Sequence, residues 1–326
     1  MSYLSITDAY NTIRSITHPK VAQKIADNIT NKIPLLYLLN KMGNKEYEGG
    51  GYDYRVPVFK ELQTVQRYTG ASVLSSTEAD PVTVAQYVRK QLTVPIFATG
   101  TKLLQNTGSS PETIINYLSV LIETAEESLK NGMDSDIFSA NGESDLGITG
   151  LQNLVSSTPS TGVTGGLDRS VYTWWQNQSS AITTNFSTNG LIAFRSLFFN
   201  CLRGDEFPTV GIITQSMYIN LHRALTSTIQ YNQPSPKTAM GDLAFEHIYF
   251  QGMPIMFGTN VPANSGYFLN LKYMSFMVAQ DRDFAIREFI TPDNQDAMLA
   301  RIYWAGNLIT SNLSRQGVLT GSGDTY

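Results

Sequence analysis

The side chains that could support metal or acid–base chemistry do not come together in the sequence. His18, His222 and His247 are far apart and share no metal-ligand spacing, and Cys201, the single cysteine, completes no zinc set with them. The sequence also lacks the glycine loops that bind phosphates or dinucleotides, and the serine motif of a nucleophile elbow. We therefore predict no catalytic residue, no metal site and no cofactor, and we do not expect an enzyme.

Five carboxylates gather within one predicted helix, where paired acids could act as proton donors or hold a cation. They are Glu123, Glu126, Glu127, Asp134 and Asp136. Their spacing places most of them on the face opposite the apolar stripe of that helix. Because charged side chains are mostly found at the surface, we predict a solvated face and no acid–base pair.

Two adjacent tryptophans, Trp174 and Trp175, stand in the segment "DRSVYTWWQNQSS". The β-branched and aromatic residues around them predict a strand, in which neighbouring side chains point to opposite faces. One tryptophan can then lie in the core, and the other needs a second apolar surface. A platform for stacking sugars or bases is the alternative, but a core position together with a subunit contact is favoured.

Composition excludes several classes of protein. The formal net charge of −4 lacks the basic excess of a protein that neutralises phosphates, so dedicated nucleic-acid binding is not expected. A single cysteine excludes an internal disulfide framework. No apolar run reaches the roughly 18 residues of a membrane span, and the first residues do not resemble a signal peptide. We expect a chain that stays in the cytoplasm, built as one elaborate domain or two to three modules.

The first hundred residues predict an arm followed by a hairpin. Residues 1–45 hold six basic residues and two aspartates, a local charge of +4, and an amphipathic helix that Pro34 perturbs. Three glycines, Gly49, Gly50 and Gly51, then form a hinge. Apolar and polar residues alternate after them, and a second strand-like run follows, "DPVTVAQYVRKQLTVPIFATG". Together they predict a long two-stranded hairpin over residues 46–101. Such a hairpin is marginal alone and should rest on another surface. The arm either packs on its own domain or reaches a partner.

The rest of the chain predicts a long helix and two groups of strands. "SSPETIINYL" begins with a capping box, and an apolar stripe continues it over residues 111–139. Residues 188–287 alternate helix and strand patterns, including a buried "VGIIT" strand, and predict a compact α+β module. Residues 288–326 return to long strands. A late strand that pairs beside the long helix would make the α+β module an insertion in an outer domain.

This order of elements resembles the major capsid proteins of tailed bacteriophages, which have the Hong Kong 97 fold. The glycine-hinged hairpin is similar to the extended loop of that family, and the capped helix with "IFSANG" and "GLQNLV" is similar to its spine helix. "PTVGIITQSMYINLHRAL", "GMPIMFGTNVP" and "GYFLNLKYM" resemble its axial domain, and "ARIYWAGNL" with "NLSRQGVL" its last peripheral strand and tail. Several elements in the same order are seldom reproduced by an unrelated fold.

The resemblance implies an α+β chain divided into an N-terminal arm (1–45), an extended loop (46–101), the spine helix and first part of the peripheral domain (102–187), an inserted axial domain (188–287), and the last peripheral strands with the tail (288–326). It implies self-assembly, as pentamers and hexamers, into an icosahedral shell around double-stranded DNA, in the virion after assembly in the host cytoplasm. The residues predicted to contact neighbouring subunits are Tyr52, Tyr54, Arg55, Val56, Val58, Lys60, Arg67, Arg89, Trp174 and Trp175.

The resemblance also implies further partners and leaves alternatives. A separate scaffolding protein and a portal are expected, because residues 1–45 are too short for a fused scaffolding domain, and DNA would be held by weak non-specific contacts. Lys60, Lys90 and Asn307 could take part in a covalent cross-link of the kind some relatives form, although no accompanying carboxylate is evident. The alternatives are the shell of a bacterial nanocompartment with the same fold, and a soluble β-rich enzyme or carbohydrate-binding protein.

Overall fold

The structure is a computed structural model of the whole chain and describes residues 34–62, 64–74, 80–106, 117–228, 248–287 and 289–321. Most of the predicted basic arm, the capped start of the long helix, and His18 and His247 lie outside the described residues. The described chain mixes helices with two sheets, in agreement with the predicted α+β class.

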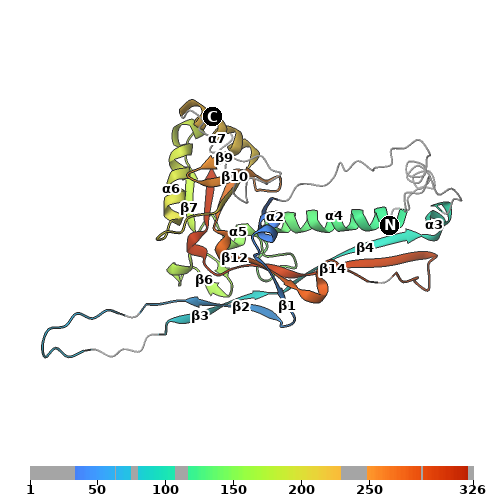
Figure 1. Cartoon of the computed structure of the whole chain (residues 1–326), viewed down its shortest axis with the longest axis horizontal. Coiled ribbons are helices and arrows are strands. Elements are labelled where there is room, and N and C mark those ends of the chain that lie inside the picture. The colour runs from blue at the N-terminus through green and yellow to red at the C-terminus, as the bar shows by residue number, and fades with distance from the viewer. Residues whose placement is uncertain are drawn as a thin grey trace.

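A five-stranded sheet forms the elongated part of the molecule (Figure 1). Its strands are β1 (Lys45–Glu48), β4 (Lys90–Thr99), β12 (Met274–Ala279), β13 (Ala285–Ile286) and β14 (Ala297–Thr310). The long strand β14 pairs antiparallel with β4, β12 and β13, and β1 adds parallel to β12. This confirms that a late strand returns to the region of the long helix.

Helix α4 (Tyr117–Ile137) runs along β4 and β14, and its apolar stripe explains why it packs there. Ala125, Leu129, Met133 and Ile137 recur every fourth residue and are all buried. The prediction of a long helix is confirmed over its described part. The short helices α2 (Pro34–Lys41), α3 (Gly100–Asn106) and α5 (Leu151–Leu154) complete this part of the fold.

A six-stranded sheet forms the second part. Its order is β7 (Gln178–Ile182), β15 (Gly317–Gly321), β11 (Ser265–Leu269), β8 (Val210–Ile213), β10 (Met253–Phe257) and β9 (Ile248–Phe250). Helices α6 (Leu191–Cys201) and α7 (Gln215–Thr228) share one core with one face of this sheet. Adjacent residues Ile212 and Ile213 belong to different cores, so β8 is covered on both faces. The predicted buried strand is thereby confirmed.

Strand pairing divides the chain differently from the expected boundaries at 187/188 and 287/288. β12, expected in the α+β module, pairs with β14 in the five-stranded sheet, whereas β7 and β15, expected outside the module, belong to the six-stranded sheet. The reason is local. The apolar run over residues 266–278 reads as continuous in the sequence, but the one-turn helix Leu271–Tyr273 redirects the chain from one sheet to the other.

Two separate ribbons lie outside the sheets. β2 (Asp53–Phe59) and β3 (Val82–Val88) pair antiparallel over their whole length, and β5 (Val163–Thr164) pairs with β6 (Leu167–Asp168). The predicted hairpin is confirmed, but it is shorter than expected. After Arg89 the chain leaves β3 and enters β4, which pairs with β14 because that strand offers a partner along ten residues, Ala297 to Gly306.

Candidate interaction surfaces

The base of the β2–β3 ribbon rests on the chain's own core. Tyr54 is 1% exposed and is buried with Ala85 and Tyr87, while Val56 and Val58 pack partly against the same core. The predicted contact of Tyr54 with a neighbouring subunit is therefore wrong, because the face that alternation marks as apolar is the face that covers this chain. For Val56 and Val58 the contact stays a prediction.

The Arg89 side chain also forms hydrogen bonds within its own chain. Its Nε donates to the hydroxyl of Tyr54 (3.2 Å) and its Nη2 donates to the carbonyl of Gly50 (2.9 Å). Gly51 has φ +104°, a left-handed conformation that favours glycine, at the point where β1 ends and β2 begins. The three glycines therefore form a turn that Arg89 supports from within the chain, and a hinge motion there stays a prediction.

The ribbon, the residue before it and the loop that connects β2 to β3 expose many apolar side chains. They are Tyr52, Phe59, Leu62, Val65, Tyr68, Val73, Leu74, Val82 and Val84. Val73 is 97% exposed, and Figure 1 shows that this loop extends away from both sheets. Exposed apolar surface of this kind indicates an interaction site, and a two-stranded ribbon is marginally stable by itself. Lys60, paired with Asp80 at 3.7 Å, and the exposed Arg55 and Arg67 lie on the same extension.

The two tryptophans occupy a 3₁₀ turn, Thr173–Trp175, and not the predicted strand. Trp175 is 1% exposed, and its Nε1 donates to the carbonyl of Thr164 (3.0 Å). Its predicted contact with a neighbour is wrong, since the turn directs the ring into the chain's own core. Trp174 is partly buried, with its ring centre 5.7 Å from those of Trp175 and Tyr172, and its contact with a neighbour stays a prediction.

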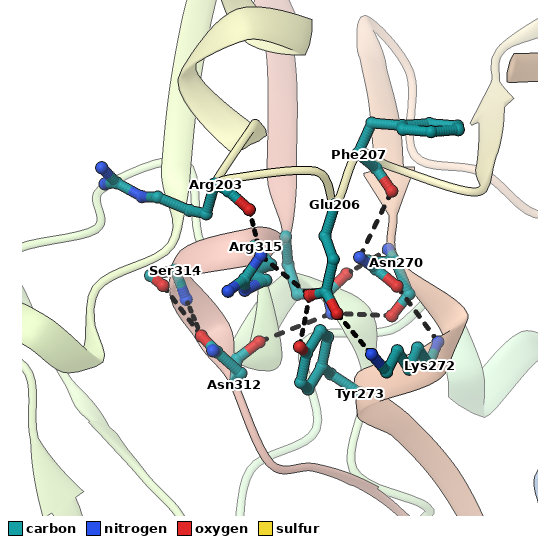
Figure 2. A network of polar contacts seen from close by, with 10 residues as sticks. Arg203, Glu206, Phe207, Asn270, Lys272, Tyr273, Asn312, Ser314 and Arg315 are labelled. Atoms are coloured by element: carbon teal, nitrogen blue, oxygen red, sulfur yellow. Dashed lines mark hydrogen bonds and ion pairs between the residues drawn. The ribbon is translucent and has the colours of Figure 1, made fainter. Parts of the chain in front are cut away.

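The two sheets are joined at a polar junction formed by residues 203–206, 270–273 and 312–316 (Figure 2). Asn270 and Gln316, both buried, bind each other reciprocally: Gln316 Oε1 accepts from the main-chain N–H of Asn270 (2.8 Å), and its Nε2 donates to the Asn270 carbonyl (3.1 Å). One residue lies on each connection between the sheets. The pair therefore fixes the two connections side by side.

Glu206 adds an ionic contact to the same junction. Its carboxylate accepts from the Lys272 ammonium, the Tyr273 hydroxyl and the Arg315 guanidinium, the last at 2.8 Å, and Arg315 also donates to the Arg203 carbonyl (2.9 Å). The hydrogen bond from Lys272, followed by that from Tyr273, lowers the pKa of Glu206. The same carboxylate raises the pKa of Tyr273.

Two carboxylates of α4 contradict the prediction of a solvated face. Asp134 is buried and accepts from Asn260 Nδ2 (2.7 Å), and burial raises its pKa to about 6. Asp136 is half-buried and accepts from the main-chain N–H of Ile148 (3.2 Å). The last turn of α4 is enclosed because it meets a loop of the six-stranded sheet on one side and the 141–148 loop on the other. Glu123 is exposed, as predicted.

In the part of the chain that the structure describes, no three His, Cys, Asp or Glu side chains are placed to hold a metal ion. Burial raises the pKa of the Cys201 thiol to about 12. The Lys90 ammonium donates to the carbonyls of Gly142, Glu143 and Asp145, and Asn307 is 0% exposed. Neither residue can reach a neighbouring subunit, so the cross-link considered for them is not supported.

Comparisons with known proteins identify the fold of the chain. No family model and no curated protein matches the sequence. Among solved structures, the capsid of cyanophage A-1(L) superposes with a TM-score of 0.70 at 16% identity, over 92% of this chain and 96% of the other. The chain has the Hong Kong 97 capsid fold. No described helix is long and apolar enough to span a bilayer.

Two further structures show the same Hong Kong 97 fold. The capsid of a native GTA particle has a TM-score of 0.62 at 12% identity, over 98% of this chain and 99% of the other. The holo-SrpI encapsulin of Synechococcus elongatus has a TM-score of 0.60 at 12% identity, over 98% and 96%. We call the β2–β3 ribbon, together with residues 60–62, 64–74 and 80–81, the extended loop.

Sequence reasoning missed the junction, although it carries a signal. Asn270 and Asn312 each accept from the main-chain N–H two residues later, at 3.1 Å in both cases. Each asparagine is followed by leucine and begins a one-turn helix at a connection between the sheets. Such side-chain-to-backbone bonds are typical of asparagine in turns. Glu206 and Gln316 give no comparable local pattern, because their partners are distant in the sequence.

Proposed function

We propose that the chain is the major capsid protein of a tailed bacteriophage and assembles into an icosahedral shell around double-stranded DNA. The observation that carries the proposal is the extended loop: a long element with uncovered apolar side chains, in a chain whose described residues superpose over nearly their full length on capsid subunits. The exposed apolar side chains of such a loop are removed from water when a neighbouring copy covers them.

Assembly follows from where the surfaces lie. The extended loop reaches away from both sheets, so one copy can lie across the next, and axial domains would meet around five-fold and six-fold axes. Contacts between two different surfaces of identical subunits close into rings when the rotation permits. Each contact can be modest, because many simultaneous contacts make a shell hard to dissociate.

The remaining partners follow from the same proposal. A separate scaffolding protein and a portal would guide closure, and the shell would reside in the virion after assembly in the host cytoplasm. With a formal net charge of −4, the subunit would hold packaged DNA by weak, non-specific contacts. Its described surfaces act as interfaces and not as a catalytic centre.

A second candidate is the shell of a bacterial nanocompartment, favoured by the superposition on the encapsulin over 98% of this chain. Both candidates share the fold and self-assembly, and they differ in what the shell contains. The phage reading predicts DNA inside the particle, whereas the nanocompartment reading predicts a protein cargo.

Expression of the full chain, alone and with the products of neighbouring genes, followed by size-exclusion chromatography and negative-stain electron microscopy, tests the proposal. We expect rings, shells or tubes. A monodisperse monomer under every condition would rule out both candidates. Nuclease-protected DNA or co-purifying protein in the particles then distinguishes the phage shell from the nanocompartment.

A further inference from the structure

Three arginines on one face of the five-stranded sheet lack an anionic partner. Arg301 lies on β14, Arg287 directly follows β13, and Arg282 ends the short turn that precedes β13. None of the three forms an ion pair with a carboxylate of the described residues. Asp283, next to Arg282 in the chain, is instead bound to Lys45 (2.5 Å). The three guanidinium groups, which we call the arginine patch, therefore remain available to an anion.

The fold brings these like charges together. The main-chain N–H of Arg287 donates to the carbonyl of Arg301 (3.0 Å), so the two residues stand opposite each other on neighbouring strands. Opposite side chains of an antiparallel pair share one face, and like charges placed there destabilise the sheet. The ring centre of Tyr303 lies 5.6 Å from the Arg282 guanidinium and 5.9 Å from that of Arg287. Phe284, between these arginines in the chain, has φ +52°, and such backbone strain is concentrated at functional sites.

The arginine patch lies on the face of the sheet that helix α4 does not cover. Ala300 and Ile302 of β14 are buried in the core shared with α4, whereas Arg301, between them, is exposed. Figure 1 shows α4 along one side of β4 and β14. Because successive side chains of a strand point to opposite faces, Arg301 and Tyr303 lie on the other side. A ligand can therefore reach the arginine patch from solvent.

Apolar side chains continue the same face next to the arginine patch. Leu299, two residues before Arg301, lies opposite both Phe97 and Ile290 in the sheet. Phe97 is 46% exposed and Ile290 is 66% exposed. Arginine and aromatic side chains are enriched in protein interfaces. The DNA backbone, by contrast, presents phosphates and sugars and has no apolar side chain to cover Phe97 and Ile290. The combination favours a protein ligand over a nucleic acid.

We propose that the arginine patch binds an extended acidic segment of a partner protein. A carboxylate of that segment binds the guanidinium groups of Arg287 and Arg301, which are suited to paired hydrogen bonds with a carboxylate. An apolar side chain two positions away covers Phe97 and Ile290, because residues two apart in an extended segment share one face and lie about 7 Å apart. The inference goes beyond the proposed function, since it concerns a partner and not the contacts between copies of the chain.

Binding of a short synthetic peptide tests the arginine patch. The probe is fluorescein-labelled Ser-Leu-Thr-Glu-Thr-Glu-Ser, in which the leucine and both glutamates share one face when the peptide is extended. One control probe has glutamine in place of both glutamates, and the other is a labelled DNA duplex. Fluorescence anisotropy is recorded with the full chain. We expect the acidic peptide to bind more tightly than either control, and to bind more weakly as salt screens the charges.

Matched variants separate the charged contact from the apolar one. Arg301→Gln should weaken binding of the acidic peptide about tenfold, whereas Arg195→Gln, at an exposed arginine of α6, should not change it. Ile290→Ser should weaken binding about threefold, whereas Ile192→Ser, at an isoleucine that is 63% exposed, should not. Arg301→Gln should also raise the melting temperature by about 1–3 °C at low salt, because it removes one of two opposed like charges.

Three results would overturn the inference. In the first, the DNA duplex binds more tightly than the peptide and Arg301→Gln abolishes that binding, which identifies a nucleic acid as the ligand. In the second, the parent chain forms particles, Arg301→Gln does not, and the peptide does not bind, which assigns the arginine patch to a second copy. In the third, no probe binds, or Arg301→Gln binds the peptide as the parent does. A chain that binds the peptide through Arg301 but never assembles would support this inference and refute the proposed function.

Discussion

The polar junction and the extended loop differ in whether one copy of the chain is enough to complete them. At the junction, Asn270, Glu206 and Gln316 find hydrogen-bond partners inside the chain. In the extended loop, apolar side chains such as Phe59, Leu62 and Leu74 remain exposed. The contacts of the junction are thus completed when the single chain folds. The apolar surface of the loop stays uncovered and is available for a contact made after folding.

Because of this difference, folding and association can be changed separately. Apolar surface buried in the core stabilises the single chain, whereas the same kind of surface in the loop stabilises only an assembly. Substitutions at the junction should therefore change the unfolding of the chain, and substitutions in the loop should change assembly. Each of the following changes tests that separation.

The largest expected effect comes from replacing residues 60–81 with Asn-Gly. Phe59 and Val82 are paired in the ribbon, and a two-residue turn of this type can join paired strands. We expect an unchanged melting temperature and a complete loss of particles in electron micrographs. As a control, a glycine–serine linker of the original length retains the reach of the loop without its apolar side chains and should also fail to assemble. Normal particles from either chain would refute the role assigned to the loop.

Much of this division could be predicted from the sequence, because it rests on local patterns. The alternation of apolar and polar residues predicted β2, and apolar residues at every fourth position predicted α4. The three glycines predicted the turn before the ribbon. The sequence could not show that Tyr54 covers the chain's own core or that Asp134 is enclosed, because each depends on a surface contributed by a distant segment. The exchange of β7, β12 and β15 between the sheets likewise depends on long-range pairing, which periodicity does not encode.

Gln316→Leu should destabilise the single chain most among junction variants. The substitution leaves the main-chain N–H of Asn270 without its acceptor in a buried site, whereas the Asn270 carbonyl still accepts from the main-chain N–H of Tyr273 (3.2 Å). Chemical denaturation should show a loss of about 1–3 kcal/mol, the cost of one unsatisfied buried group. Gln295→Leu, at an exposed glutamine, is the control and should change the free energy of unfolding by less than about 0.5 kcal/mol. Equal effects of the two variants would contradict the role of the reciprocal pair.

Asp134→Asn should alter how stability depends on pH. The folded pKa of about 6 lies above the ordinary 3.8, so the folded chain retains a proton that the unfolded chain loses, and stability falls as pH rises between these values. The Asn variant lacks this titration and should gain about 1–3 kcal/mol relative to the parent between pH 4 and pH 7. Asp293→Asn, at an exposed aspartate, should follow the parent chain. Parallel pH profiles of the parent and Asp134→Asn would show that Asp134 titrates normally.

Glu206→Gln should have the smallest effect, because solvent reaches this carboxylate and screens its ion pairs. The hydrogen bonds from Lys272 and Tyr273 lower the pKa of Glu206 below its ordinary value of 4.5. Its contribution to stability is therefore present above pH 4.5 and lost as pH falls through the lower, folded value. Melting temperatures of parent and variant should differ slightly at pH 7 and converge in acid, while the neighbouring Asp205→Asn follows the parent. If Glu206→Gln unfolds normally but fails to assemble, the junction contributes to association as well, and the separation between it and the extended loop does not hold.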